Sequence, residues 1–174
     1  NSLFLYYFHE KSDRIFRVFV SSNMTGTEMM HAVSSAPMME ALLNDYPQVE
    51  NAVRLHKAGD ILIRDGDRKY FEKGTSFLFA DSSFFDVFSF KLLKGDPRTC
   101  LKEARSIVLT EEYARKYFGD ENPVGKIIRW NNRDELTVTG VIESPPANSH
   151  LDFDALVSFS TRYRDRQLYM GWNG

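Results

Sequence analysis

The pattern of apolar and polar residues before residue 58 predicts a strand, a helix and a second strand. Residues 13–22 are rich in β-branched and aromatic side chains, which favour a strand. Residues 22–35 are rich in Ser, Thr, Gly and Met and predict a loop. A helix is predicted at 37–47, and a further strand at 49–57.

The predicted helix carries one apolar stripe between two prolines. Pro37 fits the first turn of a helix, and Pro47 cannot continue one. Four apolar residues between them recur at helical spacing and form one stripe. They are Met39, Leu42, Leu43 and Tyr46.

From residue 58 onward, short β-rich segments replace this pattern. Asp65-Gly66 and Asn131-Asn132 each stand between two runs typical of strands, which indicates two hairpins. The other predicted strands are 76–80, 89–97, 106–110, 126–130, 135–143 and 151–160.

Two short helices are expected among these strands. One follows Ser82 or Ser83 and carries a phenylalanine cluster, which we expect in the core rather than in an exposed docking patch. The other begins after the N-cap Thr110 and ends at Gly119. The apolar members of the two helices are Phe84, Phe85 and Phe88, and Ala114, Tyr117 and Phe118.

Strand periodicity predicts which residues of the two last strands share a face. Strict alternation places successive side chains of a strand on opposite faces. In 135–143, one face is then Leu136, Val138 and Ile142, and the other is Thr137, Thr139 and Val141. In 151–160, one face is Phe153, Val157 and Phe159.

The order of these elements predicts an α+β fold made of two parts. Residues 1–57 and 144–174 would form an outer unit, with its last strand at 151–160. Residues 58–143 would form a β-rich insertion between them.

Composition and charge narrow the function classes. A chain of 174 residues with 43% apolar and 26% charged residues is typical of one globular domain. The net charge is −2 with both signs mixed, so no nucleic-acid partner is expected. Residues 3–8 are strongly apolar but far shorter than the roughly 18 residues of a membrane span. The single cysteine, Cys100, is expected to be a buried thiol rather than a nucleophile.

The segment 118–126, FGDENPVGK, has a glycine followed by a lysine and invites comparison with a phosphate-binding loop. Such a loop needs G-x-x-x-x-G-K-[ST] between a strand and a helix. Here the glycines are one residue too far apart, and Ile127 replaces the hydroxyl residue. We therefore expect a helix stop, a proline-stiffened turn and a special backbone angle at Gly125.

A search for a metal or catalytic site yields only weak candidates. His150, Asp152 and Asp154 would share one face of a strand and could bind a divalent metal, although an exposed polar face is favoured. His9 and Asp13 could meet on a helical turn, where a local cap or ion pair is favoured over a site. No residue is assigned as catalytic, cofactor-binding or metal-binding.

Several blocks of the chain resemble, in order and spacing, one family. They are similar to the extracytoplasmic core domain of MacB-like and FtsX-like ABC transporter permeases. The blocks are residues 8–18, 45–55, 77–97, 106–128 and 137–159.

This resemblance implies an organisation and a function. The outer unit, 1–57 and 144–174, would be a porter-like subdomain, and 58–143 a sabre-like insertion. The domain would lie in the periplasm, between the first and second transmembrane helices of a permease in the cytoplasmic membrane. It would be non-catalytic and need no cofactor, because ATP is hydrolysed on a separate cytoplasmic domain.

The resemblance also implies partners and leaves alternatives open. Expected partners are the permease's own transmembrane helices, a second permease copy, a cytoplasmic ABC ATPase and a periplasmic adaptor or lipoprotein. The chain ends before a strand and helix that family members usually have, so the porter-like part is expected to be incomplete after Gly174, with an edge that could pair two copies. A ligand-sensing or peptide-binding domain and a metal-dependent hydrolase are the alternatives.

Overall fold

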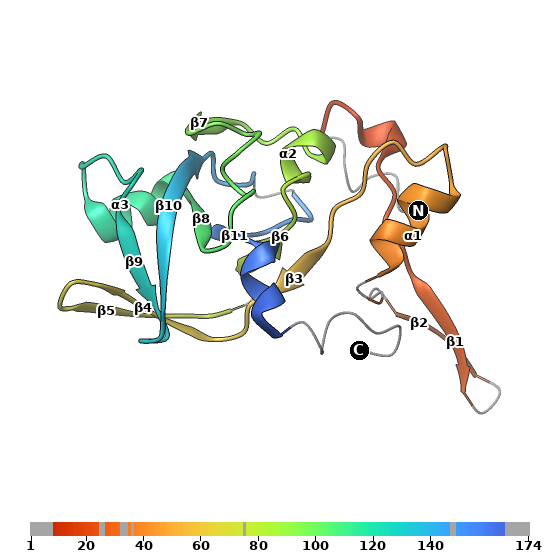
Figure 1. Cartoon of the computed structure of the whole chain (residues 1–174), viewed down its shortest axis with the longest axis horizontal. Coiled ribbons are helices and arrows are strands. Elements are labelled where there is room, and N and C mark those ends of the chain that lie inside the picture. Colours follow the sequence, from red (N-terminus) through yellow and green to blue (C-terminus); the bar gives the residue numbers. More distant parts are fainter. Residues whose placement is uncertain are drawn as a thin grey trace.

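Nine strands form one mixed sheet, and Figure 1 shows them through the body of the protein. The computed structural model describes residues 9–24, 27–31, 35, 37–74, 76–146 and 149–165. The strands are β3 (Leu55–Lys57), β4 (Ile61–Asp65), β5 (Arg68–Glu72), β6 (Phe77–Ala80), β7 (Leu92–Lys94), β8 (Ser106–Thr110), β9 (Ile127–Trp130), β10 (Asp134–Ile142) and β11 (Ala155–Ser158). Their order is β3-β6-β11-β8-β10-β9-β4-β5, with β7 also paired to β10. This arrangement confirms the predicted α+β class.

The first part of the chain departs from the predicted order of strand and loop. A 3-10 helix (Ser12–Arg14) occupies the start of the predicted strand 13–22, and β1 (Val20–Met24) begins only near its end. β2 (Thr27–His31) lies where a loop was expected and pairs antiparallel with β1. The residues of β2 carry little strand signal of their own, because pairing with a neighbour decides strand formation as much as propensity does.

Helix α1 (Met38–Asp45) forms where the apolar spacing predicts it, but its stripe is not buried. Leu43 is 37% exposed and Tyr46 55% exposed, and α1 contains no buried residue. Periodicity identifies the apolar face of a helix, whereas burial requires a partner surface. In Figure 1, α1 and the β1-β2 hairpin lie at one end of the molecule, and the β4-β5 hairpin reaches the other end.

Both predicted hairpins are present. The β4-β5 hairpin pairs Asp65 with Arg68, so its two turn residues are Gly66 and Asp67, one position later than predicted. The turn after β9 uses the left-handed backbone of Asn131 (φ 49°) and Asn132 (φ 58°). Asparagine tolerates this conformation better than most residues, which explains its place in such turns.

A bulge in β10 changes the predicted face pattern. The parallel register between β10 and β8 shifts between Val138 and Gly140. As a result Val141 joins the same buried cluster as Leu136 and Val138, while Ile142 packs in the cluster on the other side. The predicted grouping of Ile142 with Leu136 was therefore wrong, because a bulge interrupts strict alternation.

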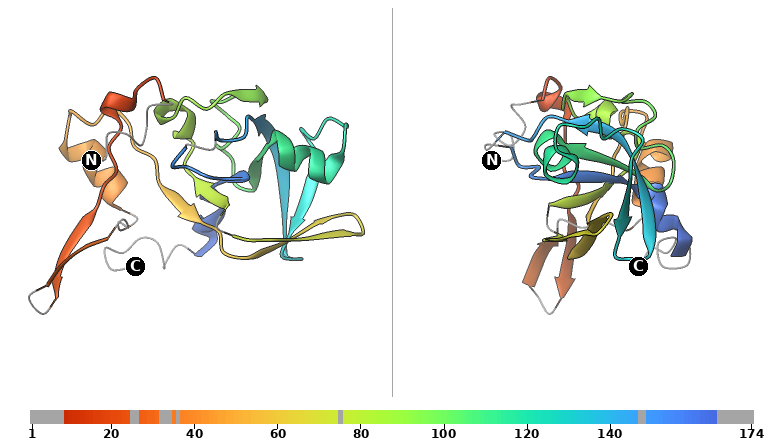
Figure 2. Two further views of the ribbon diagram at one scale, coloured as in Figure 1. Left: turned by 180° about the vertical axis from the view of Figure 1, so that it is seen from behind. Right: turned by 90° about the vertical axis from the view of Figure 1, so that its left-hand side faces the viewer.

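Two apolar clusters fill the core. One includes α3 (Glu111–Phe118), whose Ala114, Tyr117 and Phe118 are buried as predicted. The other includes α2 (Phe84–Val87), with Phe84 and Phe88 buried among other phenylalanine rings. This placement confirms the core assignment of that phenylalanine cluster. The rear view of Figure 2 shows α2 (yellow-green) and α3 (teal) apart from each other along the long axis of the molecule.

The strands β3 and β11 belong to the same sheet as the strands of the predicted insertion. β11 runs parallel to β6 and antiparallel to β8, and β3 pairs with β6. The β11 strand is shorter than the predicted 151–160, because a 3-10 helix (Phe159–Asp165) follows it directly. β11 also begins only at Ala155, so Phe153 lies before the strand and in a different cluster from Val157. The subdomain boundaries at 57/58 and 143/144 stay a prediction.

Candidate functional site

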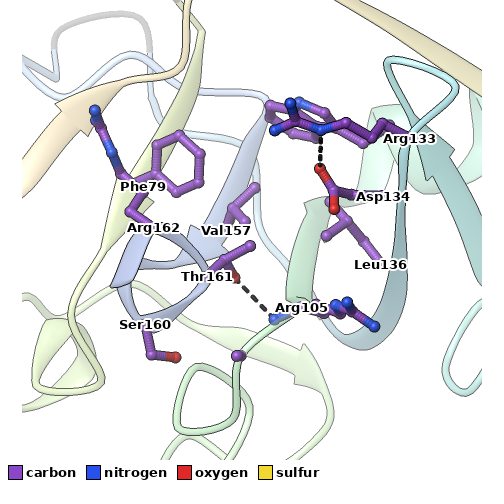
Figure 3. Close-up of a pocket in the computed structure, with 11 residues that line it drawn as sticks. Phe79, Arg105, Arg133, Asp134, Leu136, Val157, Ser160, Thr161 and Arg162 are labelled. Atoms are coloured by element: carbon purple, nitrogen blue, oxygen red, sulfur yellow. Dashed lines mark hydrogen bonds and ion pairs between the residues drawn. The ribbon is translucent and has the colours of Figure 1, made fainter. Parts of the chain in front are cut away.

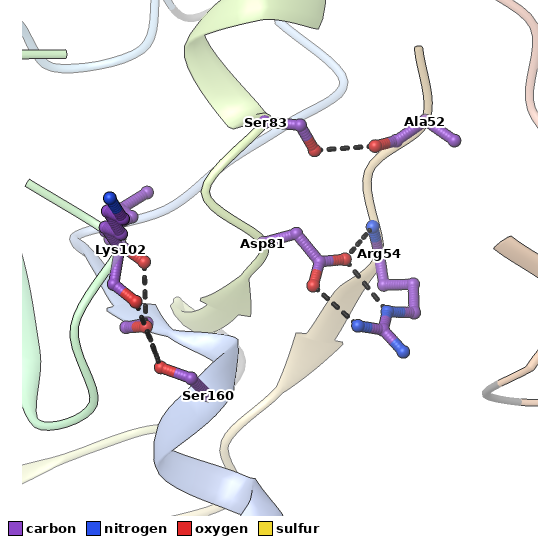
Figure 4. A network of polar contacts seen from close by, with 8 residues as sticks. Ala52, Arg54, Asp81, Ser83, Lys102 and Ser160 are labelled. Carbon is purple, nitrogen blue, oxygen red and sulfur yellow. Dashed lines mark hydrogen bonds and ion pairs between the residues drawn. The ribbon is translucent and has the colours of Figure 1, made fainter. Parts of the chain in front are cut away.

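An ion pair joins the segment before β3 to the end of β6 (Figure 4). The Asp81 carboxylate accepts hydrogen bonds from the Arg54 backbone N–H (2.8 Å), Nε (2.9 Å) and Nη2 (2.7 Å). The two side chains are only 14% and 12% exposed. The Arg54 guanidinium also lies 4.3 Å from the centre of the Phe159 ring. Two parallel hydrogen bonds between a guanidinium and a carboxylate are strong and also fix the orientation of both side chains.

Serine hydroxyls reinforce the same region. Ser83 Oγ donates to the Ala52 carbonyl at 2.6 Å, two residues before Arg54. Ser83 occupies the predicted N-cap position of α2, but its side chain makes no cap hydrogen bond. Nearby, Ser158 Oγ donates to the Leu101 carbonyl and lies 2.7 Å from Ser160 Oγ.

A hollow of about 210 Å³ opens between the ends of β6, β10 and β11 (Figure 3). Its apolar lining includes Trp130, Leu136 and Val157, of which Leu136 and Val157 are 1% exposed. Its polar lining contains three arginines and comes from three separate segments. These polar residues are Arg105, Arg133, Asp134, Ser160, Thr161 and Arg162.

The backbone holds Arg105 at the rim of this hollow in an unusual conformation. Arg105 has φ 64°, in the left-handed region that non-glycine residues seldom adopt. Its N–H donates to Thr161 Oγ1 at 2.8 Å, and its carbonyl accepts from the Thr137 N–H at 2.8 Å. The hydrogen bonds of its N–H and its carbonyl therefore offset the free-energy cost of the left-handed conformation, which is of order 1–2 kcal/mol.

A buried carboxylate fixes α3 to the sheet edge. Glu72, 5% exposed, accepts from Tyr117 Oη at 2.9 Å and from Lys116 Nζ at 2.7 Å. Burial, followed by the Glu72 charge, raises the pKa of Tyr117 far above its usual range. The tyrosine hydroxyl stays a hydrogen-bond donor at any physiological pH, which suits a structural rather than a catalytic role.

The segment 118–126 forms the structural turn that its sequence predicts. Gly119 (φ 62°) ends α3, and Gly125 (φ 90°) precedes β9. The Gly125 N–H donates to Val138 O, and the Lys126 N–H to Pro123 O. The Lys126 ammonium contacts the Glu121 carboxylate and lies 5.1 Å from the Phe118 ring centre. The backbone N–H groups of both Gly125 and Lys126 are therefore occupied, the first by β10 and the second within the turn.

The candidate metal residues do not share a strand face. β11 begins at Ala155, so His150, Asp152 and Asp154 lie in the irregular segment before it. Within the described ranges, no three His, Cys, Asp or Glu side chains gather closely enough to hold a metal ion. Cys100 is buried, and burial raises the pKa of its thiol to about 11. A thiol with such a pKa is a poor nucleophile near neutral pH.

His9 is part of the phenylalanine cluster rather than a partner of Asp13. Its Nδ1 accepts a hydrogen bond from the Ser89 N–H at 3.1 Å. Its ring centre lies 5.0 Å from that of Phe88 and 4.9 Å from that of Phe90. Burial lowers the pKa of His9 below its usual 6.5.

The buried imidazole predicts a pH dependence of stability. Because the folded-state pKa is below 6.5, the unfolded chain takes up the proton first as the pH falls. We therefore expect the free energy of unfolding to be constant with respect to this group above pH 6.5 and to decrease below it. Urea unfolding at pH 7.5 and 5.5 would measure the difference. His9→Gln should reduce that difference, and an unchanged difference would contradict the assignment.

Sequence reasoning missed both the Arg54–Asp81 pair and the arginine-lined hollow. The members of each group are far apart along the chain, and their charges are ordinary in their local context. A prediction that β3 pairs with β6 would have indicated that Arg54 and Asp81 lie close together. No local pattern marks Arg105.

Comparisons with known proteins place the chain in a family of transporter domains. Among the described residues, no helix is both long and apolar enough to cross a membrane. No curated protein sequence shows significant similarity to the chain. Solved structures resemble it in fold, and in the three described below 61% to 67% of their chains is covered.

The first of these is a permease-protein domain from Porphyromonas gingivalis, with a TM-score of 0.72 and 25% identity over 85% of this chain and 61% of that one. The second is the periplasmic region of MacB from Actinobacillus actinomycetemcomitans, with a TM-score of 0.57 and 18% identity over 86% of this chain and 67% of that one.

The third is the extracellular domain of the noncanonic ABC-type transporter YknZ from Gram-positive bacteria. It has a TM-score of 0.51 and 18% identity over 75% of this chain and 67% of that one. This chain thus spans less than two thirds of the P. gingivalis domain. The sequence model of the MacB-like periplasmic core domain matches residues 2–172, nearly the whole length. The chain therefore belongs to the family of MacB-like periplasmic core domains.

Proposed function

We propose that this domain transmits movement outside the cytoplasmic membrane for an ABC transporter permease. Its own transmembrane helices would flank it, and a cytoplasmic ABC ATPase would drive the movement. The domain itself would be non-catalytic and would couple ATP hydrolysis to the movement or release of substrate in the periplasm. Family membership over residues 2–172 supports the setting.

The Arg54–Asp81 pair carries the mechanical part of the proposal. The chain passes from α1 and the β1-β2 hairpin into the sheet through β3 (Figure 1). The ion pair and the Ser83–Ala52 hydrogen bond fix this entry to the end of β6. A force applied to the N-terminal part would thus reach the nine-stranded sheet through a rigid connection.

The subdomains and partners belong to the same proposal. We assign residues 1–57 and 144–174 to a porter-like part and 58–143 to a sabre-like insertion. A second permease copy, identical or related, would face this one, and an adaptor or lipoprotein would bind outside the membrane. β3 and β5 are the end strands of the large sheet as described, and each offers an edge for such contacts.

The intact permease offers a direct test of the rigid connection. Inserting Gly-Ser-Gly between Glu50 and Asn51 lengthens the chain just before Ala52 and Arg54. Spin labels on Arg68→Cys in both copies, in a Cys100→Ser background, would report their separation by pulsed electron resonance. We expect ATP binding to change the separation in the parent and not in the insertion variant, with ATP hydrolysis retained in both.

A matched insertion between Asp120 and Glu121, in the exposed turn after α3, serves as the control, because it leaves both the entry at β3 and the labelled position 68 unchanged. It should leave the ATP-dependent change in place. No change in the parent permease, or a full change in the Glu50/Asn51 insertion, would refute the proposal.

A further inference from the structure

The hollow beside Trp130 combines an apolar floor with a cationic rim. Trp130 is 8% exposed, and Leu136 and Val157 are almost fully buried. Three arginines and one aspartate supply the formal charges of the lining, which leaves an excess of two positive charges. Figure 3 shows these charged side chains around the apolar ones, with Arg133 and Asp134 adjacent and Arg105 and Arg162 on two other segments of the chain.

The three arginines at the rim of the hollow differ in the contacts that their side chains make. The Arg105 side chain has no hydrogen bond or ion pair within the described parts of the chain. Arg133 Nε lies 3.4 Å from Asp134 Oδ2, and the Arg133 side chain is 85% exposed, so this contact contributes little. Arg162 lies 5.1 Å over the Phe79 ring, which orients its guanidinium.

The backbone at Arg105 gives this arrangement a second distinguishing feature. A left-handed conformation is costly for a non-glycine residue such as Arg105. The Thr161 and Thr137 hydrogen bonds nevertheless hold it beside the 3-10 helix that carries Arg162. The guanidinium is thereby placed at the rim with little freedom in its backbone.

We propose that this hollow binds a small amphipathic anion: a carboxylate or phosphate ester attached to an apolar group. Guanidinium groups recognise both anions by paired hydrogen bonds, and the Ser160 and Thr161 hydroxyls line the same hollow. The apolar group would contact Trp130, Leu136 and Val157. The site is independent of the transmission function proposed above, since it does not include Arg54 or Asp81.

Nuclear magnetic resonance of the two tryptophan indole groups tests this site in the 174-residue chain. Trp172→Phe assigns the Trp130 signal by elimination. The probes are phenyl phosphate and phenylacetate, which separate a phosphate ester from a carboxylate, together with neutral 2-phenylethanol and inorganic phosphate. We expect a saturable shift of the Trp130 signal with at least one aromatic anion, and at least tenfold weaker binding of 2-phenylethanol and of inorganic phosphate.

Arginine variants separate the site from a general charge effect. Arg105→Gln and Arg133→Gln should each weaken binding of the aromatic anion about tenfold, as the loss of one charged hydrogen bond predicts. Arg68→Gln, an equal charge change on exposed β5, should leave binding unchanged. The unfolding midpoint of each variant shows that it is folded.

Three results would overturn the proposal. The first is no saturable shift of Trp130 with either aromatic anion. The second is equal binding of 2-phenylethanol, which would indicate a purely apolar hollow. The third is equal weakening by Arg68→Gln and Arg105→Gln, which would indicate attraction by the overall charge of the protein.

Discussion

Asp81→Ala is expected to lower the free energy of unfolding by about 3–5 kcal/mol, the usual cost of breaking a buried ion pair. The substitution leaves the Arg54 guanidinium and its backbone N–H without the carboxylate that accepts three hydrogen bonds from them. Both side chains are less than 15% exposed, so solvent replaces the lost contacts poorly. Urea unfolding followed by circular dichroism would measure the change.

Two further variants make this expectation specific. Asp67→Ala removes the same charge at an exposed turn and should change the free energy of unfolding by less than about 0.5 kcal/mol. The double variant Arg54→Met with Asp81→Leu removes both charges and should recover part of the loss. A loss under 1 kcal/mol for Asp81→Ala would show that the pair does not hold the entry of β3.

Gly74→Ala is expected to cost about 3 kcal/mol, at the upper end for an overpacked site. A Cβ atom on Gly74 would overlap the carbonyl group of Gly59, which is backbone and cannot rotate away. The Gly74 N–H also donates to Asp60 Oδ1 at 3.1 Å, so the two strands approach closely at the base of the β4-β5 hairpin. Thermal and urea unfolding would both report the loss.

Gly66→Ala provides the comparison, because glycine is favoured at this position only by the positive φ angle and not by a lack of space. Gly66 has φ 56°, and nothing lies within 4 Å of an added Cβ. Its expected cost is about 1–2 kcal/mol from conformational strain alone. If Gly66→Ala cost as much as Gly74→Ala, the close approach at Gly59 would not explain the effect.

Local patterns predicted those elements whose determinants lie within a few residues. The helix between Thr110 and Gly119 follows from its cap, its periodicity and its terminal glycine, and the structure places it there. The strand 106–110 has three consecutive apolar residues at its centre and is buried throughout. In both, local preference and tertiary packing favour the same conformation.

Elements decided by distant partners could not be predicted in this way. β2 forms through pairing with β1, and the bulge at Val138 and Gly140 depends on the register with β8. The close approach of Lys94 O and Leu92 to Gly140 shows how tightly this part of β10 is enclosed. The hollow beside Trp130 arises from the ends of strands that are adjacent only in the folded sheet.

The position of β11 in the sheet has a consequence for how the protein is made. Of the described strands, β11 is the last along the chain, yet it lies between β6 and β8 and joins the β3-β6 pair to all the other strands of the large sheet. A nascent chain that has not yet emerged as far as Ser158 therefore cannot connect these two halves. Their unpaired edges stay accessible to other chains until synthesis passes this residue, so folding of the sheet is completed late and depends on contacts far apart in sequence.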